Sequence, residues 1–415
     1  MNETMTLDEQ AERLALGTEE ILPPGELAAR LRACAEARRP LRVKQGFDPT
    51  APDIHLGHTV GLRKLRQFQD LGHQVVLIVG DYTGMVGDPS GLSKTRPQLT
   101  RDEVERNAAT YLEQFYRVLE RSPRAPRLPV EVHRNGEWFA AMSFMDIMRL
   151  ASKFTVSQIL EREDFSKRFH AEQPIAVHEL LYPLMQGYDS VAIHSDLEIG
   201  GTEQKFNLLV GRELQRLHGQ PPQVVMTLPL LPGLDGVQRM SKSLGNYVGV
   251  TDSPGDMFGK IMSLPDPMMS LFWRLATDAE PRELEAIGRE LADPGVNPMS
   301  IKKRLAGRIV TLYHGAEAAR RAQQNFEAQF GRREIPADLP VWTADSAGEM
   351  GIKDLLVRSG LARTGSEAWR AVDQGAVSID QTRVSDRNHR QPLEAAFVLR
   401  LGRRMIRVEP RAGTK

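Results

Sequence analysis

The 415-residue chain carries 54 basic and 54 acidic residues, and 41% of its residues are hydrophobic, so its length predicts about two to four domains with packed cores. A single cysteine, Cys34, excludes a disulfide framework and a cysteine zinc site within the chain. The acidic start lacks the apolar segment of a signal peptide and no run of about 18 apolar residues occurs, so we expect a soluble cytoplasmic protein.

The first half of the chain predicts a doubly wound α/β domain. Residues 1–40 are helical in pattern and form an N-terminal extension. Residues 41–47 predict a strand, 55–71 a helix, and 75–79 a continuous apolar strand of the buried parallel kind. Strand, helix and strand make a βαβ unit with a right-handed connection. We therefore expect a Rossmann-like parallel sheet over residues 41–250, with its site at the carboxyl ends of the strands.

The second half predicts a change of architecture. Within residues 101–231, the spacing of apolar residues favours helices at 101–121, 137–164 and 180–189 and a strand at 223–231. Residues 251–330 are then helical and rich in charge without strands, which predicts a separate helical domain. Residues 331–350 contain two prolines and little periodicity, so we interpret them as a linker. Residues 351–415 predict two short helices followed by short strands.

His55-Leu56-Gly57-His58 opens the helix predicted at 55–71. Two histidines three positions apart face one side of the first turn, where free N–H groups and the helix dipole favour a phosphate. Gly57 has no Cβ, so a flat base could lie against the backbone. A pair of surface histidines is the plainer alternative. A metal site is a poorer one, because no carboxylate or third histidine follows at helical spacing.

Arg239-Met240-Ser241-Lys242-Ser243 lies in a polar loop flanked by glycines, after the strand predicted at 223–231. Two cations on a mobile loop can engage a triphosphate chiefly in the transition state, when charge develops on the leaving pyrophosphate. A solvated basic loop is the alternative, although the string Met-Ser-Lys-Ser-Leu-Gly-Asn is more specific than two charges. No P-loop or dinucleotide-binding glycine motif competes.

Tyr182, Gln186 and Asp189 are spaced to share one face of the helix predicted at 180–189. The flanking leucines indicate that this segment is buried, and buried polar groups need partners. A small polar ligand would satisfy them. An exposed polar face is the alternative interpretation.

Together and in this order, the His55 and Arg239 segments resemble the two signatures of class I aminoacyl-tRNA synthetases, and the surrounding residues are similar to the tyrosyl-tRNA synthetases along most of the chain. The resemblance implies that tyrosine and ATP, with Mg²⁺, form tyrosyl-adenylate, and that the acyl group moves to the 3′ end of tRNA(Tyr). It implies catalytic roles for His55, His58, Arg239 and Lys242. It implies no protein-bound metal or prosthetic group, and a homodimer with an insertion around 125–165 at the interface.

The resemblance also assigns contacts to both small substrates. ATP would contact Gly46, Asp48, Thr50, Gly57, Gly200, Glu203 and Met240. Tyrosine would contact Asp88, Tyr182, Gln186, Asp189 and Gln204. Among these, Asp189 would accept from the phenol, while Tyr182 and Gln186 would hold the amino group with Asp88 nearby. Tryptophanyl-tRNA synthetase and a non-catalytic RNA-binding paralogue remain the alternative functions.

Departures from the better-known bacterial pattern at Lys44, Glu203 and Leu92, the last where a basic residue is common, place the chain nearer to a second bacterial subgroup. Lys44 stands where that branch has a tyrosine that touches the phenol, and Glu203 replaces an aspartate. Arg239 replaces the first lysine of the loop signature, which keeps the charge but changes reach and donor geometry. The resemblance leaves open how the phenol gains its second contact.

The C-terminal region is the basic end of the chain. From Lys353 onward, 13 lysines and arginines stand against 7 acidic residues, a net charge of +6. Its pattern resembles the S-four-like RNA-binding domain, which implies that Arg358, Arg363 and Arg370 contact phosphates. A small dimerisation or capping domain is the alternative. By the same resemblance, residues 251–330 would bind the anticodon.

Overall fold

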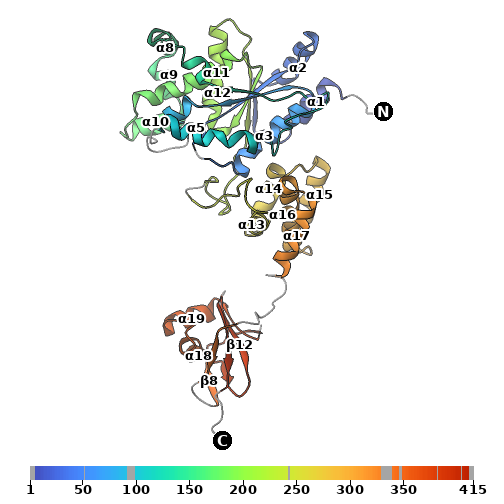
Figure 1. Ribbon diagram of the computed structural model, residues 1–415, viewed down its shortest axis with the longest axis vertical. Helices are drawn as coiled ribbons and strands as arrows, with labels where there is room; N and C mark the ends of the chain where they lie inside the picture. The colour runs from blue at the N-terminus through green and yellow to red at the C-terminus, as the bar shows by residue number, and fades with distance from the viewer. Residues whose placement is uncertain are drawn as a thin grey trace. The chain divides into compact units, whose positions relative to one another are not determined.

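The chain folds into two compact bodies. The computed structural model describes residues 5–50, 52–90, 99–241, 244–328, 339–344, 348–380, 382–402 and 404–410. The first body comprises Met1–Gln323 and the second Gln324–Lys415 (Figure 1). Among the described residues, no helix is both long and apolar enough to cross a lipid bilayer.

The first body is built around a six-stranded sheet in the order β1-β6-β5-β2-β3-β4. The strands are β1 (Glu20–Leu22), β2 (Arg42–Phe47), β3 (Gln74–Val79), β4 (Glu131–Arg134), β5 (Leu197–Gly201) and β6 (Val224–Leu228). All neighbours pair in parallel except β1, which runs antiparallel to β6 at the edge. The chain winds outward in both directions from β2, so the strand order reverses between β2 and β5. The predicted doubly wound parallel sheet is therefore confirmed.

Helices cover both faces of this sheet. They are α1 (Leu7–Ala15), α2 (Glu26–Glu36), α3 (Leu56–Asp70), α4 (Thr83–Val86), α5 (Arg101–Ala109), α6 (Tyr111–Phe115), α7 (Gly136–Phe139), α8 (Phe144–Ala151), α9 (Val156–Leu160), α10 (Glu163–His170), α11 (Tyr182–Ala192) and α12 (Lys205–Leu217), with 3₁₀ turns at Val177–Leu181 and Thr202–Gln204. Neighbouring residues of β2 show the two faces, because Lys44 bonds α11 on one side while Gln45 lies against Gly61 of α3 on the other. Figure 1 shows α8, α9 and α10 at the end of the body opposite α1 and α2.

The helix predicted at 137–164 is instead a series of short helices. Ser143 caps α8 and Thr155 caps α9, and each side chain accepts from the backbone N–H three residues later. A side chain that caps a helix has left helical geometry itself, so each cap interrupts the run. The prediction of one long helix was wrong for this reason.

Three strands of the first body's sheet were not predicted. β1, β4 and β5 have three, four and five residues. Segments this short contain too few alternations to separate a strand from a loop. β5 also ends in two glycines, which are uncommon inside strands.

A group of helices follows the sheet within the first body. They are α13 (Pro254–Met262), α14 (Met269–Ala276), α15 (Pro281–Ala292), α16 (Pro298–His314) and α17 (Ala316–Phe326), with a 3₁₀ turn at Asp266–Met268. α13 packs on α16, and α14 packs on α3. The hydroxyl of Tyr313 donates to Thr59 over 3.1 Å and accepts from Arg63 over 3.1 Å. The helical group is thus bonded directly to the helix that begins at the His55 segment.

The second body has its own core. Its elements are β7 (Val341–Thr343), β8 (Glu349–Gly351), α18 (Ile352–Arg358), α19 (Gly365–Asp373), β9 (Val377–Ile379), β10 (Thr382–Arg383), β11 (Arg390–Pro392), β12 (Phe397–Leu401) and β13 (Arg404–Glu409). One sheet has the order β10-β9-β12-β13-β7, and β11 pairs with β8. β7 and the buried Ala344 belong to this body, because β7 pairs in parallel with β13. Both fall inside the predicted linker 331–350, so the folded part begins earlier than we expected.

Candidate active site

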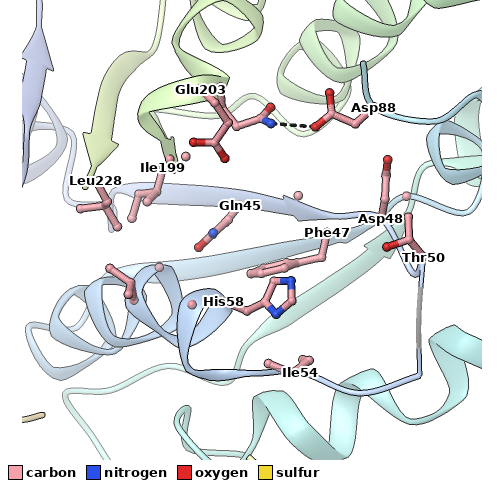
Figure 2. Close-up of a pocket in the computed structure, with 18 of the residues that line it drawn as sticks. Gln45, Phe47, Asp48, Thr50, Ile54, His58, Asp88, Ile199, Glu203 and Leu228 are labelled. Carbon is pink, nitrogen blue, oxygen red and sulfur yellow. Dashed lines mark hydrogen bonds between the residues drawn. The ribbon is translucent and has the colours of Figure 1, made fainter. Parts of the chain in front are cut away.

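A cavity of about 670 Å³ opens where the strand order reverses. This is the position at which an open α/β sheet usually binds its ligand. The cavity collects all of the described residues that the sequence analysis assigned to ATP and tyrosine: Gly46, Asp48, Thr50, His55, Gly57, His58, Asp88, Tyr182, Gln186, Asp189, Gly200, Glu203, Gln204, Arg239 and Met240. Lys242, the remaining residue, lies outside the described residues. In Figure 2, Gln45 and Phe47 of β2 lie between His58 on one side of the cavity and Asp88 with Glu203 on the other.

The two histidines form the start of α3. His55 is the N-cap residue, and its backbone N–H donates to Nδ1 of His58 over 3.2 Å. The ring centroids are 3.8 Å apart. A Cβ on Gly57 would lie 3.0 Å from the His55 ring, which is too close, and 3.7 Å from Cβ of Met240. A larger residue here would force the His55 ring to shift by a few tenths of an ångström, so glycine lets the two signature segments lie close together.

Asn246 holds the Arg239 loop in shape. Its Oδ1 accepts from the Ser241 N–H over 2.8 Å, while its Nδ2 donates to Asp235 over 2.6 Å and to the Arg239 carbonyl over 3.2 Å. A Cβ on Gly233 would lie 2.2 Å from this amide, so the loop closes tightly around it. The side chain of Arg239 itself is exposed.

The segment after this loop is bonded to the start of α3. Leu56 N–H donates to the Val248 carbonyl over 2.9 Å, and Val250 N–H donates to the Ile54 carbonyl over 2.9 Å. The two segments form a short antiparallel bridge at His55 and Gly249. Although about 190 residues apart in sequence, the two motifs are therefore neighbours through main-chain bonds.

The polar face of α11 is buried. Tyr182 is 5% exposed and Asp189 is 3% exposed, so the alternative of an exposed polar face is wrong. The Tyr182 hydroxyl donates to Asp48 over 2.9 Å. Trp138 Nε1 donates to Asp189 over 3.0 Å, and Asn135 Nδ2 lies 3.5 Å from its other oxygen. All three predicted side chains face the cavity from one helix.

Burial changes the acidity of this face. Loss of hydration raises the pKa of Asp189 to about 7, although the charge of Lys44 lowers it in part. The pKa of Tyr182 is raised well above its usual value by burial, and next by the nearby charge of Asp48. The Asp189 carboxyl is thus poised between its charged and neutral forms near neutral pH.

Lys44, at the position where the better-known bacterial branch has a tyrosine, does not line the cavity. It is fully buried beneath α11, where its ammonium lies 3.0 Å from Glu198 and donates to the Gln186 carbonyl and the Ser190 hydroxyl over 3.0 and 2.8 Å. Trp138 and Asn135 are the residues beside Asp189 instead. The sequence analysis missed both, because no spacing relates them to α11.

Glu203 and Asp88 both lie on the side of the cavity opposite α3 (Figure 2). Glu203 is exposed to the open cavity, yet the surrounding protein atoms remove enough water to raise its pKa, and the charge of Asp88 raises it further. Gln204 Nε2 donates to Asp88 over 2.8 Å. The cavity therefore has an acidic wall that includes these two carboxyl groups and a cationic loop that includes Arg239.

The three arginines predicted to bind RNA lie in the second body. Arg358 ends α18, Arg363 lies in the following turn and Arg370 lies in α19, and all three side chains are exposed. Nearby arginines are engaged within the body, since Arg387 pairs with Asp373.

Comparisons with known proteins identify the family of this chain. The family model described as tRNA synthetases class I (W and Y) matches residues 36–331. A tyrosine–tRNA ligase of Moorella thermoacetica is 50% identical over 94% of this chain and 93% of its own length. One of Methylococcus capsulatus is 48% identical over 99% of this chain and 100% of its own length.

Solved structures agree at the level of the fold. A C-terminally truncated mitochondrial tyrosyl-tRNA synthetase of Aspergillus nidulans has a TM-score of 0.64 at 20% identity, covering 78% of this chain and 94% of its own. The Archaeoglobus fulgidus tyrosyl-tRNA synthetase complexed with L-tyrosine has a TM-score of 0.61 at 22% identity, covering 77% and 100%. The chain therefore belongs to the class I tRNA synthetases of the tryptophan and tyrosine group, and within it to the tyrosyl-tRNA synthetases.

Proposed function

We propose that this protein is a tyrosine–tRNA ligase, which activates tyrosine with ATP and transfers it to the 3′ end of tRNA(Tyr). The observation that carries this proposal is the shared cavity. The buried polar face of α11, the two histidines of α3 and the Arg239 loop all line it. A non-catalytic paralogue has no need to keep these three parts together.

The first step joins tyrosine to ATP. The carboxylate oxygen of tyrosine attacks the α-phosphorus of ATP, which enters as its magnesium complex, and the bond to the pyrophosphate oxygen breaks. His55 and His58, at the amino end of α3, stabilise the charge that develops on the α-phosphate. Arg239 and Lys242 stabilise the leaving pyrophosphate. Gly57 and Met240 lie against the nucleotide, with Gly46, Asp48, Thr50, Gly200 and Glu203 along the strand ends. No covalent enzyme intermediate is required, since positioning and electrostatics supply the catalysis.

Tyrosine is selected at α11. Asp189 accepts a hydrogen bond from the phenol, and Trp138 holds the carboxylate in place over 3.0 Å. Tyr182, Gln186, Asp88 and Gln204 surround the amino group. A substrate that lacks the phenol oxygen would leave Asp189 buried without that bond, which is the physical basis for rejecting phenylalanine.

ATP–pyrophosphate exchange with each amino acid in turn tests this function. We expect exchange with tyrosine alone. Exchange with tryptophan would support the related tryptophanyl enzyme, and no exchange with any amino acid would support a non-catalytic role. In Asp189→Ala, exchange should lose its preference for tyrosine over phenylalanine, and retained preference would contradict the assignment of Asp189.

The tRNA is bound by the parts of the chain beyond the cavity. The helices α13 to α17 form the anticodon-binding region, and the second body is an S-four-like RNA-binding domain. Support comes from its net charge of +6 from Lys353 onward and from the exposed Arg358, Arg363 and Arg370. A cytoplasmic location stays a prediction from composition.

The enzyme acts as a homodimer through the region that includes residues 125–165. The support is a cluster of exposed apolar side chains on α8, where Phe144 is 77% exposed, Met145 56% and Met148 47%. Val156 at the start of α9 is a further 62% exposed. Large apolar side chains gathered on one surface are typical of a protein interface. In a dimer with a twofold axis, the same surface of each subunit packs against that of its partner.

A further inference from the structure

Arg162 is a buried arginine that no step above uses. It lies between α9 and α10 and is 3% exposed. A guanidinium taken out of water needs several acceptors, since its charge is never lost. The location of those acceptors shows what Arg162 does.

Two of its three nitrogens, Nη1 and Nη2, point toward the amino-acid end of the cavity. Nη1 donates to Oδ1 of Asn207 over 3.0 Å. Nη2 donates to the Ser90 hydroxyl and lies 3.4 Å from Oδ1 of Asp88. Nε lies 2.8 Å from Asp164. Arg162 therefore contacts the proposed ammonium-binding carboxylate directly and reaches the rest of the site through Asn207.

Asn207 passes this contact on to two glutamines of the tyrosine site. Its Nδ2 donates to Oε1 of Gln186 over 2.8 Å and to Oε1 of Gln204 over 3.0 Å. Gln204 in turn donates through Nε2 to Asp88 over 2.8 Å. The bonds form a closed chain that starts and ends at the Arg162–Asp88 pair.

The donor and acceptor roles in this series of hydrogen bonds are fixed at its two ends, by Arg162 and by Asp88. Arginine can only donate, so the Asn207 atom that faces it must be the oxygen. Asn207 must then donate to both glutamines, whose oxygens face it. Gln204 is left with its amino group toward Asp88, which as a carboxylate can only accept. If Asn207 turned over, Gln204 would turn with it and present an oxygen to Asp88, and two acceptors facing each other are unfavourable.

We propose that Arg162 is a positioning residue for the amino group of the substrate. It fixes the direction of the hydrogen bonds between the amide side chains, and thereby keeps the Asp88 carboxylate aimed at the substrate's ammonium group. This inference rests on the proposed tyrosine site. It predicts that Arg162, which does not line the cavity, determines selectivity for a substrate that carries an ammonium group.

The test compares tyrosine with 3-(4-hydroxyphenyl)propionate, which has the phenol and the carboxylate but no amino group. The dissociation constant of each is measured by calorimetry for the parent, Arg162→Met and Asn207→Asp. Aspartate at 207 still accepts from Arg162 but cannot donate to the glutamines, so it interrupts the series of hydrogen bonds at a second point. We expect both variants to bind tyrosine about 10- to 100-fold more weakly, the effect of one or two charged hydrogen bonds, with a much smaller change for the analogue.

Arg168→Met is the matched control. Arg168 lies in α10, is 1% exposed and pairs with Glu179 over 2.6 and 3.0 Å. This variant should lose stability as Arg162→Met does, but keep the parental ratio of the two dissociation constants. Arg162→Lys should recover part of the ratio, and KM for ATP should stay near the parental value in every variant.

The outcomes separate the inference from the function on which it rests. If Arg162→Met fails to fold, the test rests on the ratio of the two dissociation constants measured for Asn207→Asp. A parental ratio in the folded variants would overturn the role of Arg162 while leaving the proposed ligase intact. A parent that exchanges pyrophosphate without a preference for tyrosine would overturn the ligase itself.

Discussion

Asp189 lowers the stability of the ligand-free fold but provides a hydrogen-bond acceptor for the substrate. Its carboxyl group is 3% exposed and carries a pKa raised to about 7 by burial. The ligand-free fold must therefore either hold a proton there or keep a poorly hydrated charge. A bound phenol would relieve this cost by donating to the carboxylate.

Replacing Asp189 by asparagine should change how stability depends on pH. Between its ordinary value of 3.8 and about 7, the carboxyl is ionised in the unfolded chain but protonated in the fold. The folded state binds the extra proton, so the free energy of unfolding falls as pH rises through this range. Asparagine does not titrate, so the stability of Asp189→Asn relative to the parent should increase from pH 4 to 7. Urea unfolding of the ligand-free proteins measures this difference, and a constant offset across the range would contradict it.

Lys242→Ala should slow tyrosine activation by on the order of 10²–10³, the usual effect of losing one strong transition-state contact. Tyrosine affinity should barely change, because the loop acts on the pyrophosphate. Pre-steady-state adenylate formation measures the rate, with Lys303→Ala in the helical group as a control for loss of a positive charge. A parental rate in Lys242→Ala would show that the loop assignment is wrong.

At the scale of single residues, the sequence predicted the motif residues of the site, and the structure added the residues that hold them in place. The motif residues were predictable because each motif is contiguous or lies on one helix, as Tyr182 and Asp189 do. Asn135, Trp138 and Arg162 were not, because they come from separate segments that only the fold brings to the tyrosine site. A buried donor such as Trp138 cannot be recognised in the sequence unless the residue that accepts its hydrogen bond is already known.

At the scale of elements, the sequence predicted the long and regular ones. β2, α3 and β3 were recovered because their periodicity extends over enough residues to separate helix from strand. β1 and β5 were missed because they are short. The interruption of the helix at 137–164 depended on side-chain caps, whose effect is decided by local hydrogen bonds rather than by hydrophobic pattern.

The Arg239 loop is an element whose shape depends on one amide. Asn246 is 7% exposed and bonds three points of the loop. Asn246→Ala should lower the rate of adenylate formation by about tenfold, the equivalent of one or two hydrogen bonds, with tyrosine affinity near the parental value. Single-turnover activation and tyrosine binding measure the two effects.

Ser253→Ala is the control for Asn246→Ala. Ser253 caps α13 just beyond the loop, where its hydroxyl accepts from Asp256 N–H over 3.2 Å. Its loss should lower stability by about 1 kcal/mol without slowing activation. Equal slowing in both variants would mean that the loop is not specifically organised by Asn246.

At the scale of the whole molecule, the two bodies should divide the reaction. A chain that ends at Ala328 retains α1 to α17 and all described residues of the cavity, so tyrosyl-adenylate formation should survive. It lacks the region of net charge +6, so tRNA charging should weaken and its binding should depend less steeply on salt. Aminoacylation across a salt series measures both, and equal charging by the two chains would exclude an RNA-binding role for the second body.

The proposed dimer should depend on the apolar surface of α8. Phe144→Asp with Met148→Asp would place charges at two exposed positions, so folding should be little affected while self-association is lost. Sedimentation velocity should shift from dimer to monomer. Arg149→Ala, on the same helix, should leave the dimer intact. A variant that still sediments as the parent does would place the interface elsewhere.

The pairing of residues 248–250 with the start of α3 also limits what the Arg239 loop can do. The loop leaves β6 at one end and is fastened beside His55 at the other, so both of its ends stay fixed at the cavity. A chain segment held at both ends has fewer conformations to lose when it closes than a free arm of equal length. Arg239 is thereby kept at a high effective concentration beside the proposed nucleotide site, and much of the entropy cost of closing this site is met when the protein folds.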